Sequence, residues 1–456
     1  MEITHPEIPP QQPQSLHYSR EVWGWAIYDF ANTIFSMNIL TLYFAGWLIL
    51  DHGLEDIWYS VTFSASMLLV ALSMPVLGAM SDAHGTKKKY LLLLTIGCVL
   101  ATLLLGVIAR LPIEVKLEMT LALLVFAAAN YCFEGGLVFY NALLPQVSHH
   151  RKMGQISGLG VGLGYLGAIV GMFLVLPFVQ GKIPMFGAAG KDQAFIPTAV
   201  LFFLFALPIF LWVKTDRPSS SDRVRVKAAF KSVWRDLVNT KKYPGVTRFL
   251  ISDFLFEDAI ATVILFMAIY TQAVMGFGEV EKTILFTVST TSAALGSIGC
   301  GWVTDRLGPK RTLSLVVWGW IVALLLVSVT SQRWLFWILG SLIGIFLGST
   351  WTASRPLMAS LVPRDKLGQF FGLYSLSGRA AAIIGPLLWG LMVLYCKQDF
   401  FVVKKIIQTV ESLGITLNPA SLETIQYRFA VLALAALMIV GWLLYRKVPD
   451  RPVHHH

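Results

Sequence analysis

The chain has 456 residues, of which 56% are hydrophobic and 14% are charged, and its formal net charge is +10. Soluble domains contain about 25% charged residues, so 36 basic and 26 acidic side chains are too few to cover a soluble surface of this size. The composition excludes a disordered chain, a collagen and a disulfide scaffold, and the long unbroken apolar runs argue against an outer-membrane barrel. It predicts an all-α polytopic membrane protein.

Runs of about 20 apolar residues indicate membrane-spanning helices. Twelve such runs are predicted, at roughly 22–50, 57–80, 89–109, 118–143, 154–179, 195–213, 247–275, 281–303, 311–330, 334–361, 368–395 and 428–446. Several exceed 25 residues, which predicts tilted or bent helices. No cleavable signal peptide is expected, because the first 20 residues are polar and rich in proline and glutamine.

Lysine and arginine are distributed unevenly over the loops. Alternate loops, starting with the N-terminal segment, contain 24 of the 36 basic residues, and the opposite loops contain nine. Because basic loops stay cytoplasmic, both termini are expected in the cytoplasm and the protein in the plasma (inner) membrane. The predicted organisation is a cytoplasmic tail (1–21), a six-helix bundle (22–213), a cytoplasmic linker with a basic amphipathic helix (214–246), a second six-helix bundle (247–446) and a cytoplasmic tail ending in a possible tag remnant (447–456).

The two halves contain the same motifs in the same order. GAMSDAHGTKK, starting at Gly78, matches GWVTDRLGPKR, starting at Gly301, at an offset of 223 residues. An Asp-Phe pair, at Asp29 and again at Asp253, has an offset of 224, and a glycine series in the fifth and eleventh runs has one of 214. The pattern predicts a six-helix unit duplicated in parallel, which places a central site between the halves near the bilayer midplane.

The repeated loop motif resembles the best-known signature of the major facilitator superfamily, and this resemblance covers nearly the whole chain. Three further strings resemble one branch, the bacterial relatives of the fungal autophagy-related vacuolar amino-acid effluxers. They are WGWAIYDFANTIFSMNI from Trp23, FYNALLPQ from Phe139 and SRPLMASLVPRDKLGQFFGLYSLSGRAAAIIGPLLWG from Ser354. Where that branch usually has lysine in the third string, this chain has Arg379, which keeps a cation but changes its geometry.

Seven ionisable residues lie inside the predicted spans: Asp29, Glu134, Asp253, Glu257, Asp258, Arg355 and Arg379. Each costs about 2.5–3.5 kcal/mol at a helix centre, so these side chains are expected to face the interior and to be paired. Acids outnumber arginines, and removal from water favours a neutral carboxyl. A coupled proton is therefore expected on Asp29, Glu134, Glu257 or Asp258. The alternative is that the charges only lock helices together.

Polar residues recur beside these charges at helical spacing. Asp29, Asn32 and Thr33 share one face of the first run, and Asn130 and Glu134 share one face of the fourth. In the superfamily, helices 1, 4, 7 and 10 line the central path, so the resemblance implies a cavity there. The residues expected to bind substrate are Asn32, Asn130, Glu134, Arg355, Arg379, Tyr140, Trp351 and Tyr374. For the aromatic residues, packing between helices is the competing interpretation.

The duplicated loop motif is expected to act in gating. Glycine permits a tight turn, and Asp82 can lie against the N-terminus of another helix, where the dipole favours an anion. The superfamily resemblance implies that this contact, toward the eleventh helix, closes the cytoplasmic side of the outward-open state. The expected gating residues are Gly78, Asp82, Gly85, Lys87, Lys88, Asp253, Asp305, Arg306 and Gly308.

The sequence predicts a secondary transporter and not an enzyme. It contains no P-loop and no GxSxG motif, and all nine histidines lie outside the apolar runs. ATP drive and intramembrane catalysis are therefore not expected. The four cysteines form no CxxC pair, so neither a metal site nor a cofactor is expected. The expected partners are a small-molecule substrate, protons and the lipid bilayer, with no nucleic acid, and the chain is expected to be a monomer.

The expected substrate is a small carboxylate-bearing metabolite such as an amino acid. Arg355 or Arg379 would hold its carboxylate, and Asp29, Glu134 or Glu257 would meet its amine or carry the proton. Export is favoured by family analogy. The alternative is an exporter of a larger amphipathic compound, such as a drug or siderophore, because a carboxylate-rich, aromatic-walled cavity also suits a cationic amphiphile.

Overall fold

The computed structural model describes residues 19–84, 86–147, 153–183, 188–214, 243, 245–362, 374, 377–378, 380–397, 400–412 and 422–449. The first crossing is one continuous helix that changes its winding. It consists of α1 (Arg20–Phe35), the π-helix η1 (Ser36–Tyr43), α2 (Phe44–Gly46) and the π-helix η2 (Trp47–Asp51). Wide π-turns are rare and occur mostly at functional sites. The linker predicted at 214–246, with its surface helix, lies almost entirely outside the described residues.

The rest of the first half contains α3 (Asp56–His84), α4 (Lys87–Ile108), α5 (Val115–Val147), α6 (Met153–Val179), the 3-10 turn η3 (Lys191–Ala194) and α7 (Phe195–Trp212). The second half contains α9 (Val246–Met275), α10 (Glu279–Leu307), α11 (Pro309–Val329), α12 (Arg333–Leu361), α14 (Ile384–Tyr395), α15 (Phe401–Ser412) and α17 (Ile425–Tyr445).

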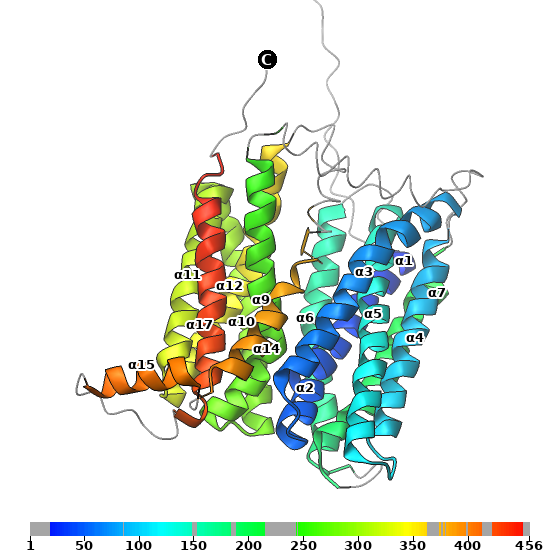
Figure 1. Ribbon diagram of the computed structural model, residues 1–456. Helices are drawn as coiled ribbons and strands as arrows, with labels where there is room; N and C mark the ends of the chain where they lie inside the picture. Colours follow the sequence, from blue (N-terminus) through cyan, green and yellow to red (C-terminus); the bar gives the residue numbers. More distant parts are fainter. Residues whose placement is uncertain are drawn as a thin grey trace, which may run out of the picture.

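Ten helical segments of the described chain are long and apolar enough to cross a membrane. The acid-rich α9 and the shorter α14 lie among them and complete the twelve crossings (Figure 1). Large apolar side chains such as Leu211, Ile298 and Trp302 are exposed on the outside, as expected where lipid replaces water. The predicted twelve-helix polytopic fold is confirmed.

Helix packing repeats between the two halves. In the first half α1 packs against α6 and α7, and α4 packs against α5 and α7. In the second half α9 packs against α14 and α17, and α11 packs against α12 and α17. These are the same pairs when α9 stands for α1 and α11 for α4. The two parallel six-helix bundles predicted from the motif offsets are therefore present, and they lie side by side in Figure 1.

The described helices of the two bundles meet in several places: α3 packs against α14, α6 packs against α10, and η1 and α2 of the first crossing pack against α9. We call the end where α1 begins and α17 ends the terminal end, and the other the far end. At the far end Trp389 Nε1 donates a hydrogen bond to Asp56 Oδ1 at 3.1 Å, and Tyr59 meets Phe266 edge to face. Deeper in the span, Ser64 Oγ donates to the carbonyl oxygen of Ile383 at 2.9 Å. The bundles are thus closed together at the far end.

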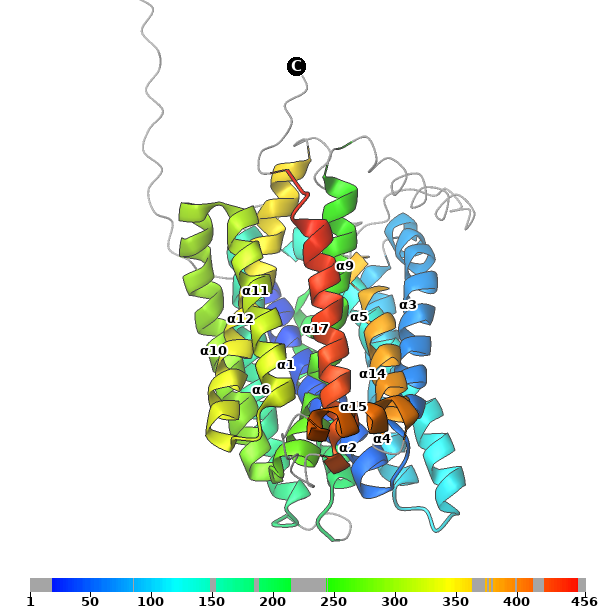
Figure 2. The ribbon, with the colours of Figure 1, turned by 60° about the vertical axis from the view of Figure 1, so that its left-hand side comes forward.

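The helix α15 runs across the bundle instead of along it. Figures 1 and 2 show it lying crosswise at the far end, at the level where the crossing helices stop. Its sequence FVVKKIIQTVES is amphipathic, with Val403 buried and Lys404 and Lys405 exposed. This is the pattern of a helix that lies in the membrane interface. A surface helix was predicted only in the linker, so this one was missed.

Close helix contact in the first bundle depends on Gly167 of α6. A Cβ atom at this position would lie 2.3 Å from the carbonyl oxygen of Phe30 in α1, which cannot move aside as a side chain would. At Gly162 of the same helix, an added Cβ would meet nothing within 4 Å. Small residues of this kind let membrane helices approach closely.

We expect Gly167→Ala to push α1 from α6 and to destabilise the protein by about 1–3 kcal/mol, the usual cost of overpacking. Gly162→Ala is the matched control and is expected to leave the melting temperature unchanged. Thermal unfolding of both variants in the same detergent measures the difference. Equal melting temperatures would contradict the close approach.

Candidate functional site

The second bundle brings together side chains from α9 and α12. Trp351 Nε1 donates to Glu257 Oε1 at 2.8 Å. One turn further along α12, the Ser354 hydroxyl is 2.8 Å from the hydroxyl of Tyr374, whose ring stacks on Phe249. Two hydrogen-bonded pairs therefore lie inside this apolar bundle. In one, the Trp351 indole holds the Glu257 carboxylate, and in the other, the Ser354 hydroxyl holds the Tyr374 phenol.

Asp253 lies one turn before Glu257 on α9. Its side chain is 1% exposed, and neither carboxylate oxygen has a hydrogen-bond partner among the described residues. It lies near Tyr374 and the half-buried Glu257. Two neighbouring carboxylates repel each other when both are ionised.

Arg355 of α12 differs from the other charges because its side chain is exposed. It forms neither a hydrogen bond nor an ion pair with any described residue. Its charge nevertheless acts on Glu257 and Tyr374 of its own bundle and on Tyr165 of α6 in the other bundle. Arg355 is thus an exposed cation within electrostatic reach of side chains of both bundles.

The first bundle presents an acid and aromatic rings to the same region. Tyr140 stacks on Trp25 with ring centroids 4.6 Å apart and on Tyr28 at 5.2 Å. Its buried hydroxyl has no hydrogen-bond partner among the described side chains and backbone, and the charge of Asp29 lies nearby. Tyr165 lies close to both Asp29 and Arg355, so it connects the two halves of the candidate site.

Two predicted site residues have structural partners, and a third is buried. Asn130 points into the first bundle, where its Nδ2 donates to Ser66 Oγ of α3 at 2.8 Å. Asn32 is 3% exposed, and its Nδ2 has no hydrogen-bond partner among the described residues. The carboxylate of Asp258 faces the backbone amides of residues 383–385 at the start of α14, a position in which the helix dipole favours an anion.

Glu134 is half-buried on α5, one turn after Asn130. Arg379 and Gly85 lie outside the described residues, as does the side chain of Asp82. The structure thus brings together Asp253, Glu257, Arg355, Trp351 and Tyr374 in the second bundle, with Asp29 and Tyr140 on the side of the first.

The expected gating residues lie at the terminal end, apart from Asp253. Lys88 Nζ donates to the carbonyl oxygen of Val213 at the end of α7. Gly308 separates α10 from α11 with φ +83°, a conformation that favours glycine. Asp305 and Arg306 are exposed in the turn before it, and Gly78 lies within α3, where an added Cβ would meet nothing. Lys87 begins α4.

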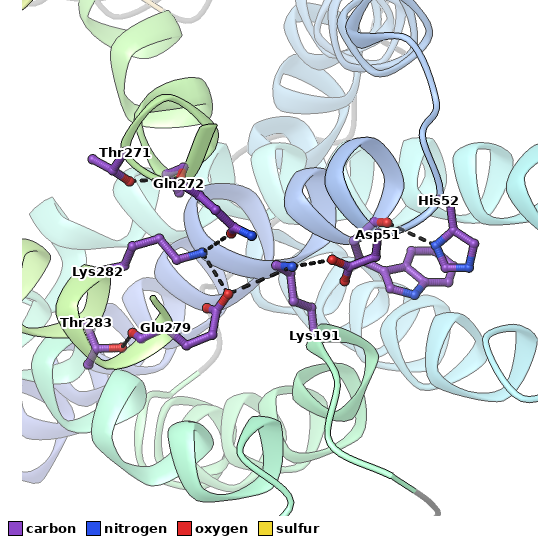
Figure 3. A network of polar contacts seen from close by, with 10 residues as sticks. Asp51, His52, Lys191, Thr271, Gln272, Glu279, Lys282 and Thr283 are labelled. Atoms are coloured by element: carbon purple, nitrogen blue, oxygen red, sulfur yellow. Dashed lines mark hydrogen bonds and ion pairs between the residues drawn. The ribbon is translucent and has the colours of Figure 1, made fainter. Parts of the chain in front are cut away.

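The far end contains a buried ion network that the sequence did not predict (Figure 3). Lys191 of η3 lies between Asp51 of η2 and Glu279 of α10, which is 3.8 Å away in the other bundle. Lys282 donates to Glu279 at 2.8 Å and to Gln272 at 2.7 Å. Lys191 and Lys282 are 6% and 1% exposed. The one available signal was Lys282 itself, a lysine inside an apolar run with acids one turn away.

Lys191 and Glu279 form the link between the bundles in this network. Asp51 with Lys191 and Glu279 with Lys282 each form a neutral pair within one bundle. Breaking a buried ion pair is usually costly because it leaves a buried charge unpaired. Separating the bundles would leave each of these four charges with a partner, so that cost would not arise. The network suits a contact that opens and closes repeatedly.

Comparison of the sequence with known protein families identifies the family of this chain. The model of the family described as "Vacuole effluxer Atg22 like" matches residues 58–399. The chain belongs to this family. Within it, the chain is 27% identical over 382 residues to an uncharacterized MFS-type transporter, YxiO, of Bacillus subtilis, covering 81% of this chain and 88% of that protein. It is 25% identical over 370 residues to autophagy-related protein 22 of Kluyveromyces lactis, covering 73% of each.

Solved structures share the fold of this Atg22-like chain. The nucleoside transporter NupG superposes with a TM-score of 0.71 at 13% identity, covering 94% of this chain and 99% of its own. A bacterial homologue of the human lysosomal transporter Spinster, in an inward-facing and unoccupied conformation, gives 0.67 at 14% identity, covering 96% and 98%. The predicted membership of the major facilitator superfamily, in the Atg22-like branch, is confirmed. The protein is a membrane transporter of this superfamily.

Proposed function

We propose that the protein is a proton-coupled secondary transporter that moves a small carboxylate-bearing metabolite, such as an amino acid, by alternating access. The observation that carries this proposal is Arg355, an exposed guanidinium that acts on side chains of both bundles and forms no hydrogen bond or ion pair with any described residue. A cation inside the membrane carries a free-energy cost when it is not paired. An anionic group of the substrate would pair with the Arg355 guanidinium. Arginine binds carboxylates with two parallel hydrogen bonds.

Glu257 is the proposed proton carrier. It lies within electrostatic reach of Arg355, and Trp351 holds one of its oxygens. When Glu257 is ionised it competes with the substrate carboxylate for Arg355, and when it is protonated it does not. Binding of a proton and binding of substrate therefore favour each other, which is the coupling that a proton-driven transporter needs. Asp253, buried without a partner one turn away, supports sharing of this proton.

Export is the proposed direction, by analogy with the vacuole effluxers after which the family is described. The predicted cytoplasmic position of both termini would make the terminal end the cytoplasmic end. Because proton and substrate are proposed to bind together, they would cross the membrane in the same direction. Export would then be driven by an outward gradient of the substrate and would carry protons out with it. The plasma membrane is the proposed location, and a monomer is the proposed state.

Proteoliposomes with an imposed pH gradient test the function. We expect one or more amino acids to move protons across the membrane, detected with an internal pH-sensitive dye. A panel of organic acids and amphipathic amines runs in parallel. If only amphipathic amines move protons, the alternative of an exporter of larger amphipathic compounds is correct, and if no solute moves, the transporter proposal fails.

Glu257→Gln tests the proton carrier. The amide keeps the oxygen that accepts from Trp351 but cannot exchange a proton at neutral pH. We expect substrate binding and exchange without a gradient to persist, while uptake driven by the pH gradient is lost. Glu114→Gln, which changes an exposed glutamate just before α5, is the control. Unchanged gradient-driven uptake in Glu257→Gln would exclude this residue.

A further inference from the structure

A cavity lies at the far end, and its lining does not include Arg355. It has a volume of about 190 Å³, and both bundles form its walls. The first bundle contributes the end of η2, the following loop and the start of α3, and the second contributes α14, Lys397 and the start of α17. Drug-sized ligands occupy pockets of about 300–1,000 Å³, so this cavity can hold only a small molecule.

Asp56 forms one wall of the cavity, and the counter-charge that acts on it is Lys397 at the rim, which forms no ion pair with it. Its side chain is 3% exposed. It accepts a hydrogen bond from Trp389 Nε1 at 3.1 Å and lies against the hydroxyl of Tyr427. Both donors are neutral, and no lysine or arginine of the described chain forms an ion pair with it. Buried charges are normally paired, so the site favours a cation in the cavity beside Asp56.

The other walls add a second charge and an apolar lining. Lys397 Nζ is 3.7 Å from Glu55 Oε1, and both side chains are about half exposed at the rim. The remaining wall is largely aliphatic and is formed by Ile49, Leu54, Ile57, Val393 and Leu394. A molecule in the cavity therefore meets a buried anion, a cation at the rim and an apolar surface between them.

We propose that this far-end cavity binds a small zwitterion with an apolar side chain, namely a free aliphatic amino acid. Its ammonium group lies at Asp56, its carboxylate at Lys397 and its side chain against the aliphatic wall. The site goes beyond the proposed transport site, because none of its residues belongs to the group around Arg355. Since both bundles form its walls, a bound amino acid stabilises the state that is closed at the far end.

Calorimetric titration of the purified full chain tests the site, with leucine as the probe. The Arg355→Ala variant is the background, so that binding at the proposed transport site does not interfere. We expect leucine to bind this background at one site. Isoamylamine, which lacks the carboxylate, is expected to bind more weakly, and isocaproate (4-methylpentanoate), which lacks the ammonium group, more weakly still.

Two variants in this background locate the binding. Asp56→Asn keeps an oxygen for Trp389 but removes the charge, and it is expected to weaken leucine binding about tenfold or more, as for other charge-assisted hydrogen bonds. Val393→Phe leaves every charge in place but fills the cavity and is expected to abolish binding. Lys404→Gln, which changes an exposed lysine on α15, is the control.

The outcomes separate the two proposals. If leucine does not bind the Arg355→Ala background, or binds it equally well after Asp56→Asn and Val393→Phe, the far-end site is wrong while the transport proposal stands. If the background binds leucine at the far end but the parent chain moves no solute in proteoliposomes, the transport proposal fails and the far-end site stands. Circular dichroism of each variant confirms that it is folded.

Discussion

Arg355→Ala is expected to abolish transport of the carboxylate-bearing substrate without destabilising the protein. The guanidinium makes no hydrogen bond or ion pair with any described residue, so its removal breaks no structural contact. Loss of one partner from a desolvated charge pair costs about 2–5 kcal/mol, and substrate binding should weaken by a corresponding factor of about thirty to several thousand. Uptake into proteoliposomes and the melting temperature are measured on the same preparation.

Arg355→Lys and Arg20→Ala complete this experiment. Lysine keeps the charge but loses the planar pair of donors, so an intermediate affinity is expected. Arg20 is exposed at the start of α1, and its replacement by alanine is expected to change neither the uptake nor the melting temperature. A fall in melting temperature for Arg355→Ala comparable to that of a buried ion pair would show that the arginine serves the fold and not the substrate.

Lys191→Gln is expected to shift the protein toward the state that is open at the far end. Lys191 and Glu279 link the bundles at 3.8 Å, and Glu279 keeps Lys282 as its partner when they separate. The neutral glutamine therefore weakens the closed state more than the open state. A conformational coupling of this kind is typically worth about 1–3 kcal/mol, which is roughly a five- to 150-fold change in the ratio of the two states.

Spin labels at positions 117 and 334 report this shift, because both side chains are exposed at the far end, one in each bundle. We expect the population with the longer label-to-label distance to increase in Lys191→Gln. Asp51→Asn is the informative control, since Asp51 pairs with Lys191 within one bundle and its loss leaves the link to Glu279 intact. Equal distance distributions for Lys191→Gln and the parent would show that the network does not hold the bundles together.

Much of the architecture could be predicted from the sequence because its determinants are local. A span needs about 20 apolar residues wherever it lies in the chain, and the repeated loop motifs indicated the duplicated bundles without any contact information. The free-energy cost of charge inside the membrane also predicted that Glu257 and Arg355 face the interior, and the structure places them within electrostatic reach of each other. Each of these inferences depends on a residue's own type and its neighbours in sequence.

The partners of those polar residues were decided by the tertiary structure. Helical spacing placed Asn130 and Glu134 on one face of α5 but could not tell whether that face meets the central space or α3, and Asn130 is bonded to Ser66 of α3. Asp258 was expected to be a proton carrier, yet it lies against the start of α14. Lys191 reaches Glu279 across 88 residues of sequence only because the bundles close at the far end. The periodicity of a helix specifies which side chains share a face, whereas the packing of whole bundles determines what each face meets.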